Sequence, residues 1–253
     1  MKQRATLHPG MAKRFDQYCP IAHALSLVGE RWALLVVREL LKGPKRYTDL
    51  AAGLPGIGTN ILATRLRELE AGGVVRKRKL PPPVASTVYE LTEYGAGLEE
   101  AIHAIARWGA RSLGPPESDD VVDPEWGLDA FPALLYPERA RGLTETYVIG
   151  VDASTFTVRL EDGGLAVELG AADDADLVVH MDMATVFALA SGDVPPGEAV
   201  EQGRVDLRQG DAATLARFFH VFSFASRVTT PADRRDDARL GPRVRVETAI
   251  PVA

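Results

Sequence analysis

The chain has 253 residues, of which 46% are hydrophobic and 25% are charged, and it contains a single cysteine, Cys19. The length suits one large domain or two modest ones, and one cysteine excludes both an internal disulfide framework and a cysteine-rich zinc site. No run of about 18 apolar residues is present, and the N-terminus lacks the apolar core of a signal peptide. We therefore expect a cytoplasmic protein without a membrane partner.

Charge is distributed unevenly along the chain. Residues 1–113 contain 17 Lys and Arg against 10 Asp and Glu, whereas residues 114–253 contain 12 against 25. The net charge is therefore +7 in the first part and −13 in the second, within a total of −6. This asymmetry predicts that only the first part faces a polyanion, although chance clustering of solvated charges gives the same totals.

The first half has the apolar spacing of several helices followed by two strands. Residues 1–17 are polar and predict a loose arm. Periodicity, caps and Gly-Pro breaks then predict helices over residues 18–28 and 30–42, a short helix capped by Thr48 and running to Ala52, a helix from Thr59 or Asn60 to the Gly72-Gly73 pair, strands over 74–80 and 87–92, and a helix from Thr92 or Glu93 to about Leu113.

The second half begins with a linker, residues 114–120, after which the pattern changes to mixed strands and helices. The elements predicted there are a helix over 127–136, strands over 144–150, 156–160, 165–169 and 177–181, a helix over 183–190, a strand over 203–207, a helix over 212–224 and a last strand over 244–252. We therefore expect an α+β fold with an arm (1–17), a first domain (18–113), a linker (114–120), a second domain (121–225) and a tail (226–253).

The element order in the first domain is that of a winged helix-turn-helix. The major groove of B-DNA admits one α-helix, and the helix after the Gly53–Gly58 turn is the candidate. Its apolar face, expected to pack on the domain, consists of Ile61, Leu62, Leu66 and Leu69. The residues expected to meet DNA are Thr59, Asn60, Thr64, Arg65 and Arg67. Asn60 can pair with adenine, and Arg65 can pair with guanine or phosphate.

A cationic segment follows that helix. Arg76, Lys77, Arg78 and Lys79 end a predicted strand just before three prolines, Pro81-Pro82-Pro83. Four positive charges on a stiff projection suit phosphate contacts or minor-groove insertion. Lys45 and Arg46, ahead of the short helix, are expected to add contacts to the DNA backbone. A solvated strand edge protected by lysines is the alternative, and the surrounding helices favour the wing.

These residues resemble the HxlR family of bacterial winged helix-turn-helix regulators. The matching pieces are Cys19-Pro20-Ile21, Gly29, Trp32, Arg46-Tyr47, Leu50, Gly56-Ile57, Leu62, Arg65-Leu66, Leu69, Tyr89-Glu90-Leu91-Thr92 and Gly95. The resemblance covers about residues 18–113. It implies a homodimer, joined through the N-terminal helices and the helix after the wing, that places two recognition helices about 34 Å apart on a pseudo-palindromic double-stranded DNA operator. Many relatives carry other polar residues at Thr59-Asn60, so the operator sequence does not carry over.

Residues from about 120 to 223 resemble the sterol-carrier-protein-like α+β fold. The resemblance is carried by Asp176-Leu177-Val178-Val179, Ala190-Ser191-Gly192-Asp193, Gly203-Arg204-Val205 and Gly210-Asp211. It implies an apolar tunnel between a sheet and helices, and hence a hydrophobic small-molecule effector. Candidate lining residues are Trp126, Phe131, Phe156, Phe187, Phe218, Phe219 and Phe222, with Phe224 beside them. A solid aromatic core without a cavity is the alternative.

Cys19 is a candidate redox switch, because some regulators resembling the HxlR family sense oxidants or electrophiles at this position. Reactivity requires an exposed thiol that ionises readily, and nearby Asp16 opposes ionisation. The alternative role is a small buried hydrophobe.

Enzyme motifs are lacking. The sequence has no GxSxG, HExxH, Walker or GxGxxG motif, and its five histidines lack metal-ligand spacing. We expect no enzyme, no cofactor and no metal. The sequence predicts a dimeric DNA-binding transcriptional regulator, expected to act as a repressor, whose second domain senses a hydrophobic molecule. The rival interpretation is a lipid-binding or carrier protein whose first domain only dimerises.

Overall fold

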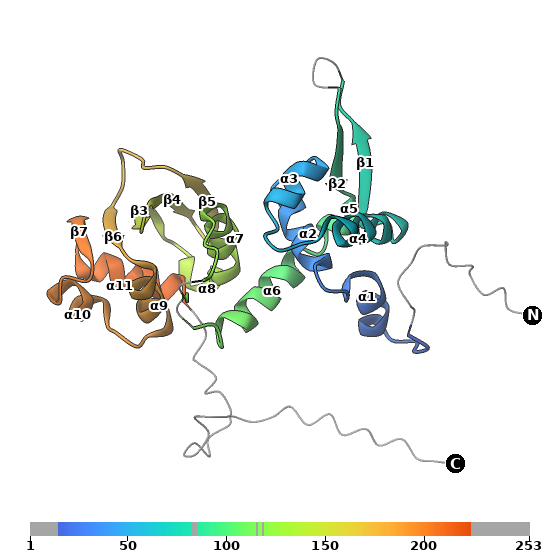
Figure 1. Cartoon of the computed structure of the whole chain (residues 1–253). Coiled ribbons are helices and arrows are strands. Elements are labelled where there is room, and N and C mark those ends of the chain that lie inside the picture. Colours follow the sequence, from blue (N-terminus) through green and yellow to red (C-terminus); the bar gives the residue numbers. More distant parts are fainter. Residues whose placement is uncertain (1–14, 82–84, 115, 118, 224–253) are drawn as a thin grey trace, which may run out of the picture.

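The computed structural model describes residues 15–81, 85–114, 116–117 and 119–223, which form two domains (Figure 1). The first contains a two-stranded sheet and the second a five-stranded sheet, each packed with helices. This confirms the predicted fold class. In the described part of the chain no single helix is long and apolar enough to cross a membrane; α1 and α2 meet that test only as a pair, bent by 80°.

The first domain packs its helices around the base of a projecting hairpin. Its elements are α1 (Pro20–Val28), α2 (Ala33–Leu41), α3 (Tyr47–Ala52), α4 (Thr59–Ala71), β1 (Val75–Lys79), β2 (Thr87–Leu91), α5 (Glu93–Ala96) and α6 (Glu99–Ala110). Val36, Val37 and Leu40 of α2 meet Leu62 and Leu66 of α4 in one buried apolar cluster. This core holds α4 and the hairpin in one unit.

The predicted starts of two helices in the first domain were wrong. α2 begins at Ala33 rather than Glu30, because Trp32 has a left-handed backbone with φ of 79°. α3 begins at Tyr47, and the Asp49 carboxylate accepts from the Arg46 amide at 3.1 Å, so the cap is not Thr48.

The helix predicted from Thr92 to Leu113 is two helices, α5 and α6. A Cβ on Gly95 would lie 2.0 Å from the carbonyl oxygen of Val74, so α5 sits directly against the start of the hairpin. The chain turns after this contact, at Gly97 and Leu98, before α6 begins.

The second domain is a mixed sheet with helices packed against it. Its elements are α7 (Pro124–Leu134), α8 (Pro137–Ala140), β3 (Thr144–Val151), β4 (Ser154–Glu161), β5 (Gly164–Leu169), β6 (Leu177–Met181), α9 (Met183–Ser191), α10 (Pro196–Glu201), β7 (Asp206–Gln209) and α11 (Ala212–Val221). The strand order is β5-β4-β3-β6-β7, and β3 and β6 are parallel whereas the other pairs are antiparallel. Alternate residues of β3 (Tyr147, Ile149, Val151) pack with α11 in the core.

One prediction for the second domain needs correction, and two short helices were missed. The strand placed over residues 203–207 is β7 at Asp206–Gln209, and neither α8 nor α10 was predicted. Pro195-Pro196 starts α10, and Gly203, with φ of 69°, follows its end, so Gly203 belongs to a turn. The predicted strand over 244–252, Phe224, and most of the predicted arm lie outside the described residues.

Candidate nucleic-acid interface

Helix α4 presents its first turn to solvent and buries its apolar side. Leu62, Leu66 and Leu69 are buried, as predicted, but Ile61 is 45% exposed. Thr59 and Asn60 are exposed at the start of the helix. Their position is fixed from α3, because the Tyr47 hydroxyl donates to the Thr59 carbonyl at 2.7 Å. The start of α4 is therefore both accessible and held in place.

The two arginines of α4 have different surroundings. Arg65 is mostly covered and forms ion pairs with Glu68 and, at 3.6 Å, with Glu30. Arg67 is exposed and donates to the Thr64 hydroxyl at 3.1 Å. Arg67 is thus the more available of the two cations, whereas Arg65 would have to leave its carboxylates to reach DNA.

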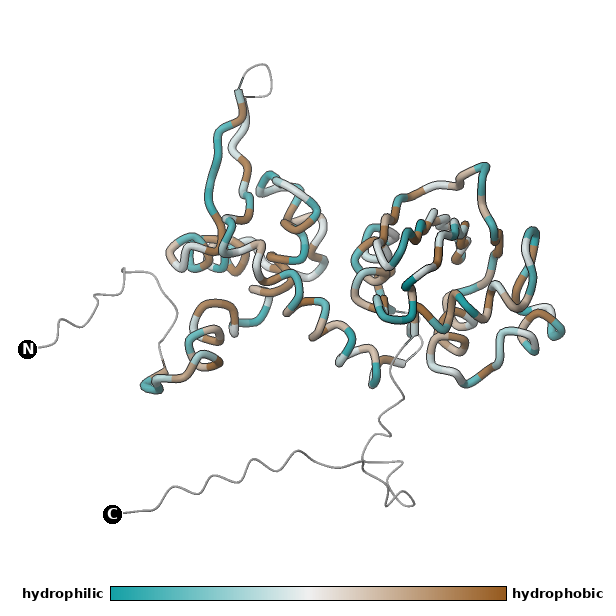
Figure 2. The backbone as a smooth tube through the Cα atoms, turned by 180° about the vertical axis from the view of Figure 1, so that it is seen from behind, coloured by the Kyte–Doolittle hydropathy of each residue, from teal (hydrophilic) through white to brown (hydrophobic). Residues whose placement is uncertain are grey.

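Strand β1 carries the four predicted wing cations. Val75 is buried, and every residue from Arg76 to Lys79 is exposed. The tube in Figure 2 is teal along this strand of the projecting hairpin. The antiparallel register sets Arg76 opposite Glu90 and Lys77 opposite Tyr89, so arginines and lysines alternate between the two faces.

A buried carboxylate organises the arginine face of the hairpin. Glu90 accepts from Arg76 Nε at 2.8 Å and from Arg78 Nε at 2.7 Å. The Arg78 hydrogen bond is the largest contribution that lowers the pKa of Glu90, and Arg76 adds to it. The two guanidinium groups thereby hold defined positions along the hairpin.

The lysine face is tied to α4. Lys77 Nζ lies 2.8 Å from Glu70 Oε2 and 5.6 Å from the centre of the Tyr89 ring, and the Glu70 contact raises the pKa of Lys77. Lys79 is exposed further along the strand. The cationic strand and α4 therefore belong to one surface unit rather than to separate faces.

Lys45 and Arg46 occupy different environments at the start of α3. The Lys45 backbone bridges to Tyr89 of β2 in both directions, at 3.0 and 2.8 Å, which fixes the base of the hairpin. Its ammonium turns inward to Glu39, 3.0 Å away. Arg46 is exposed. The two residues predicted as a pair are thus one inward-facing and one outward-facing cation.

Glu39 and Glu90 were both missed by the sequence reasoning. Glu39 lies in the middle of the apolar helix α2 with only 1% of its surface exposed. Burial raises the pKa of its carboxyl, but hydrogen bonds from Lys45 and Arg38 and the charge of Lys42 outweigh this and lower it overall. The sequence signal that could have revealed Glu39 was its place as an acidic residue inside an apolar run, because a buried carboxylate requires a basic partner.

The predicted ligand-lining residues form a packed aromatic cluster in the second domain. Phe156, Phe218, Phe219 and Phe222 are buried, and Phe131 meets Phe156, Phe218 and Phe222 edge to face at centroid distances of 5.5 to 6.2 Å. Phe187 is buried on α9. This is the arrangement of a core, and a role in lining a ligand cavity stays a prediction.

Trp126 does not join this cluster. Its ring lies under the Arg38 guanidinium of the first domain, 5.0 Å from ring centre to guanidinium carbon. The Trp126 side chain thus faces α2, and its role in binding a ligand stays a prediction.

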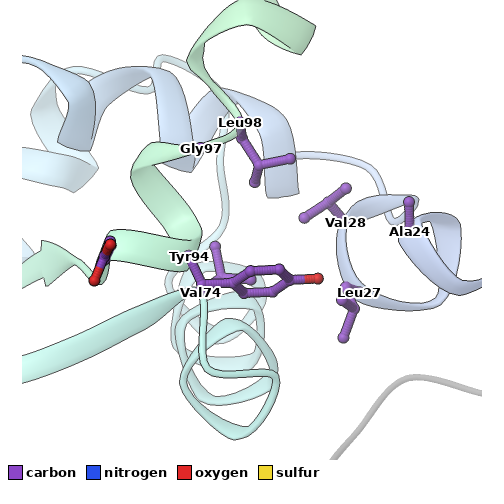
Figure 3. A pocket seen from close by; sticks show the side chains of 8 residues that line it. Ala24, Leu27, Val28, Val74, Tyr94, Gly97 and Leu98 are labelled. Carbon is purple, nitrogen blue, oxygen red and sulfur yellow. The ribbon is translucent and has the colours of Figure 1, made fainter.

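An apolar groove of about 600 Å³ lies in the first domain between α1 and α5. It is lined by Ala24, Leu27, Val28, Val74, Glu93, Tyr94, Gly97 and Leu98. Figure 3 shows the Tyr94 side chain lying across it toward Leu27 and Val28. Its lining comes from three separate segments, so no local pattern predicted it. Cys19 is half-buried and precedes α1.

Comparison with known protein families accounts for both domains. The model of the HxlR-like helix-turn-helix family matches residues 27–117, and the model of the SCP-2 sterol transfer family matches residues 129–223. Curated relatives match the first domain over most of their own length. The chain belongs to the HxlR-like helix-turn-helix family.

The relatives of this HxlR-like chain are helix-turn-helix transcriptional regulators. YodB of Bacillus subtilis is 34% identical over 101 residues, which cover 40% of this chain and 90% of YodB. YvaP of the same organism is 32% identical over 101 residues, covering 40% of this chain and 94% of YvaP. The solved structure of reduced YodB has a TM-score of 0.35 and 33% identity, covering 40% of this chain and all of that one.

Proposed function

We propose that this protein is a dimeric transcriptional regulator that binds double-stranded DNA through α4 and the hairpin. The observation that carries the proposal is the joint surface of the exposed first turn of α4 and four exposed cations on β1. Phosphate contacts from β1 would position the domain, and Thr59 and Asn60 would reach base edges. The transcriptional regulators among its relatives support this proposal.

Two apolar surfaces in the first domain support dimerisation. The exposed large apolar residues of α1, α6 and their flanks are Phe15, Tyr18, Ile21, Leu25, Ile105, Trp108 and Leu113. The groove beside α1 adds further apolar surface. Large apolar side chains exposed on helices in this number are typical of an interface. A second copy covering it would give a two-fold complex that reads a pseudo-palindromic operator.

The second domain is proposed to sense a hydrophobic molecule. The SCP-2 match over residues 129–223 supports this class of ligand. Binding would open the aromatic cluster around Phe131 and shift α7, which contacts the first domain. The regulator would act as a repressor whose DNA affinity changes with ligand.

Neutralising the two wing lysines tests DNA binding. Lys77→Gln with Lys79→Gln leaves Arg76 and Arg78 on Glu90, so the hairpin keeps its arginine contacts. We expect weaker binding to a selected duplex and a salt slope shallower by roughly two units, about 0.9 per lost phosphate contact. Fluorescence anisotropy at several salt concentrations measures both quantities.

The matched control removes two exposed cations from the second domain, Arg141→Gln with Arg208→Gln. It should leave the affinity and the slope unchanged. Equal losses in both double variants would mean that only net charge matters, and the proposed wing contact would be rejected.

The SCP-2 match favours one second candidate, a lipid carrier whose first domain only dimerises. That function predicts binding of a fluorescent fatty acid by the wild type with no binding to any duplex in the selection. Binding to a selected duplex would reject it.

A further inference from the structure

Helix α7 of the second domain places carboxylates on cations of the first domain, between α2 and α3. Lys42 Nζ lies 3.1 Å from Asp129 Oδ2, and Lys45 Nζ lies 3.8 Å from Glu125 Oε2. Arg38 Nε is 3.9 Å from the same Asp129 oxygen. We call Arg38, Lys42 and Lys45 the α2–α3 cations. Each of them is mostly covered in the docked arrangement.

Further contacts fix α7 in this position. Trp126 packs under the Arg38 guanidinium, and Arg107 of α6 donates to the Ala133 carbonyl at the end of α7, 3.2 Å away. The HxlR-like match ends at residue 117 and the SCP-2 match begins at 129, so Glu125 and Trp126 lie outside both. The contact is therefore a feature of this two-domain chain and is not described by either family model alone.

The charges balance only when α7 is docked. Within the first domain, the described carboxylate that the α2–α3 cations contact is that of Glu39. One carboxylate against three cations leaves two surplus positive charges. Asp129 and Glu125 supply the two missing negative charges. Undocking of α7 would thus expose a cationic surface at the start of α3.

One polar group in the docked contact has no partner. Trp126 Nε1 is buried without a hydrogen-bond partner among the described residues, whereas Lys42 Nζ and Asp129 Oδ2 lie 3.1 Å apart as an ion pair. Burial raises the pKa of Asp129, although Lys42 and Arg38 oppose the rise. A buried indole N–H without a partner lowers the stability of the closed contact.

We propose that α7 is an autoinhibitory contact, in which Asp129 and Glu125 compete with DNA phosphates for the α2–α3 cations. The inference rests on the proposed DNA-binding function. Lys45 lies two residues before the start of α3, and α3 is the first helix of the helix-turn-helix pair, the helix expected to cross the DNA backbone. Any event in the second domain that lifts α7 raises DNA affinity.

The test removes both α7 carboxylates from the full chain with Asp129→Asn and Glu125→Gln. Affinity for a selected duplex should rise by about threefold to tenfold, and the salt slope should steepen by roughly one to two units as phosphates gain new partners. The control, Glu161→Gln with Glu201→Gln, makes the same net change on exposed residues of β4 and α10. It should change neither quantity. Equal gains in both variants, or weaker binding by Asp129→Asn/Glu125→Gln, would overturn the proposal.

A second readout needs no DNA. Acetic anhydride labelling followed by mass spectrometry compares Lys42 and Lys45 with exposed Lys79 in the same molecule. The α7 variant should label both lysines faster relative to Lys79, and the control should match the wild type. Unchanged labelling would show that α7 does not cover these cations, which overturns the contact itself. If the wild type binds no duplex but the α7 variant still labels both lysines faster, the DNA-binding function is rejected and the contact stays supported.

Glu125→Gln alone protects the test against misfolding. Glu125 is half-exposed, so its substitution leaves the core intact. It should give a smaller gain in affinity and in Lys45 labelling of the same sign. No gain in either quantity counts against the proposal.

Discussion

Two buried carboxylates, Glu39 and Glu90, organise the cations of the first domain. Each lies in an element whose pattern gave little sign of a charge cluster, and each accepts from two basic side chains. The exposed cations of β1 were predictable because a basic run before prolines marks a projection. Their pairing with Glu90 was not predictable, because it depends on the register of β1 and β2. The pairing of Lys45 with Glu39 was not predictable either, because it depends on how the backbone of Lys45 bonds to β2.

Replacing Glu39 should destabilise the fold strongly at neutral pH. Glu39→Gln leaves Arg38, Lys42 and Lys45 without their shared carboxylate, a loss of about 2 to 4 kcal/mol in the free energy of unfolding. Because the folded-state pKa of Glu39 is lowered, its contribution is present above the ordinary glutamate pKa of about 4.3 and is lost as pH falls through the folded value. Urea unfolding at pH 7 and below pH 4 measures this: the gap between wild type and variant should narrow in acid. A gap independent of pH would contradict it, and the exposed Glu161→Gln serves as control.

At the scale of elements, long periodic helices and strands were predictable, and their ends were not. α4 and β6 lie where the apolar pattern placed them, because burial on one face sets that pattern. The break between α5 and α6 depends on Gly95 meeting the Val74 carbonyl, a tertiary contact without a local signal. Short α10 escaped prediction because six residues give too little periodicity.

The exposed apolar face of α1 is the part of the proposed dimer interface that is simplest to test. Ile21 is 71% exposed and Leu25 is 49% exposed on the same side of this helix, so charging them disturbs little within one chain. Ile21→Asp with Leu25→Asp should convert dimers to monomers in light scattering and weaken duplex binding at least tenfold, because half-sites are then bound separately. The control, Leu169→Asp, charges a similarly exposed residue of β5 and should remain dimeric. A variant at α1 that stays dimeric would place the interface elsewhere.

The whole molecule combines a basic domain with an acidic one, as the charge distribution predicts. What composition could not show is that the two halves meet through charge, with α7 on the α2–α3 cations. The residues of that contact are distant in sequence, so the sequence alone did not indicate it. Local pattern assigned Lys45 to the DNA backbone and Trp126 to the ligand-lining residues. The structure gives both a place in the contact between the domains.

The most direct test of this account is selection of bound sequences from a random duplex pool by the full-length protein, followed by the mass of the purified complex. We expect an enriched inverted repeat with half-sites about one helical turn apart, or 10 to 10.5 base pairs, and two chains for each duplex. Failure to enrich any sequence at low salt, or enrichment of a single half-site by one chain, would contradict the account.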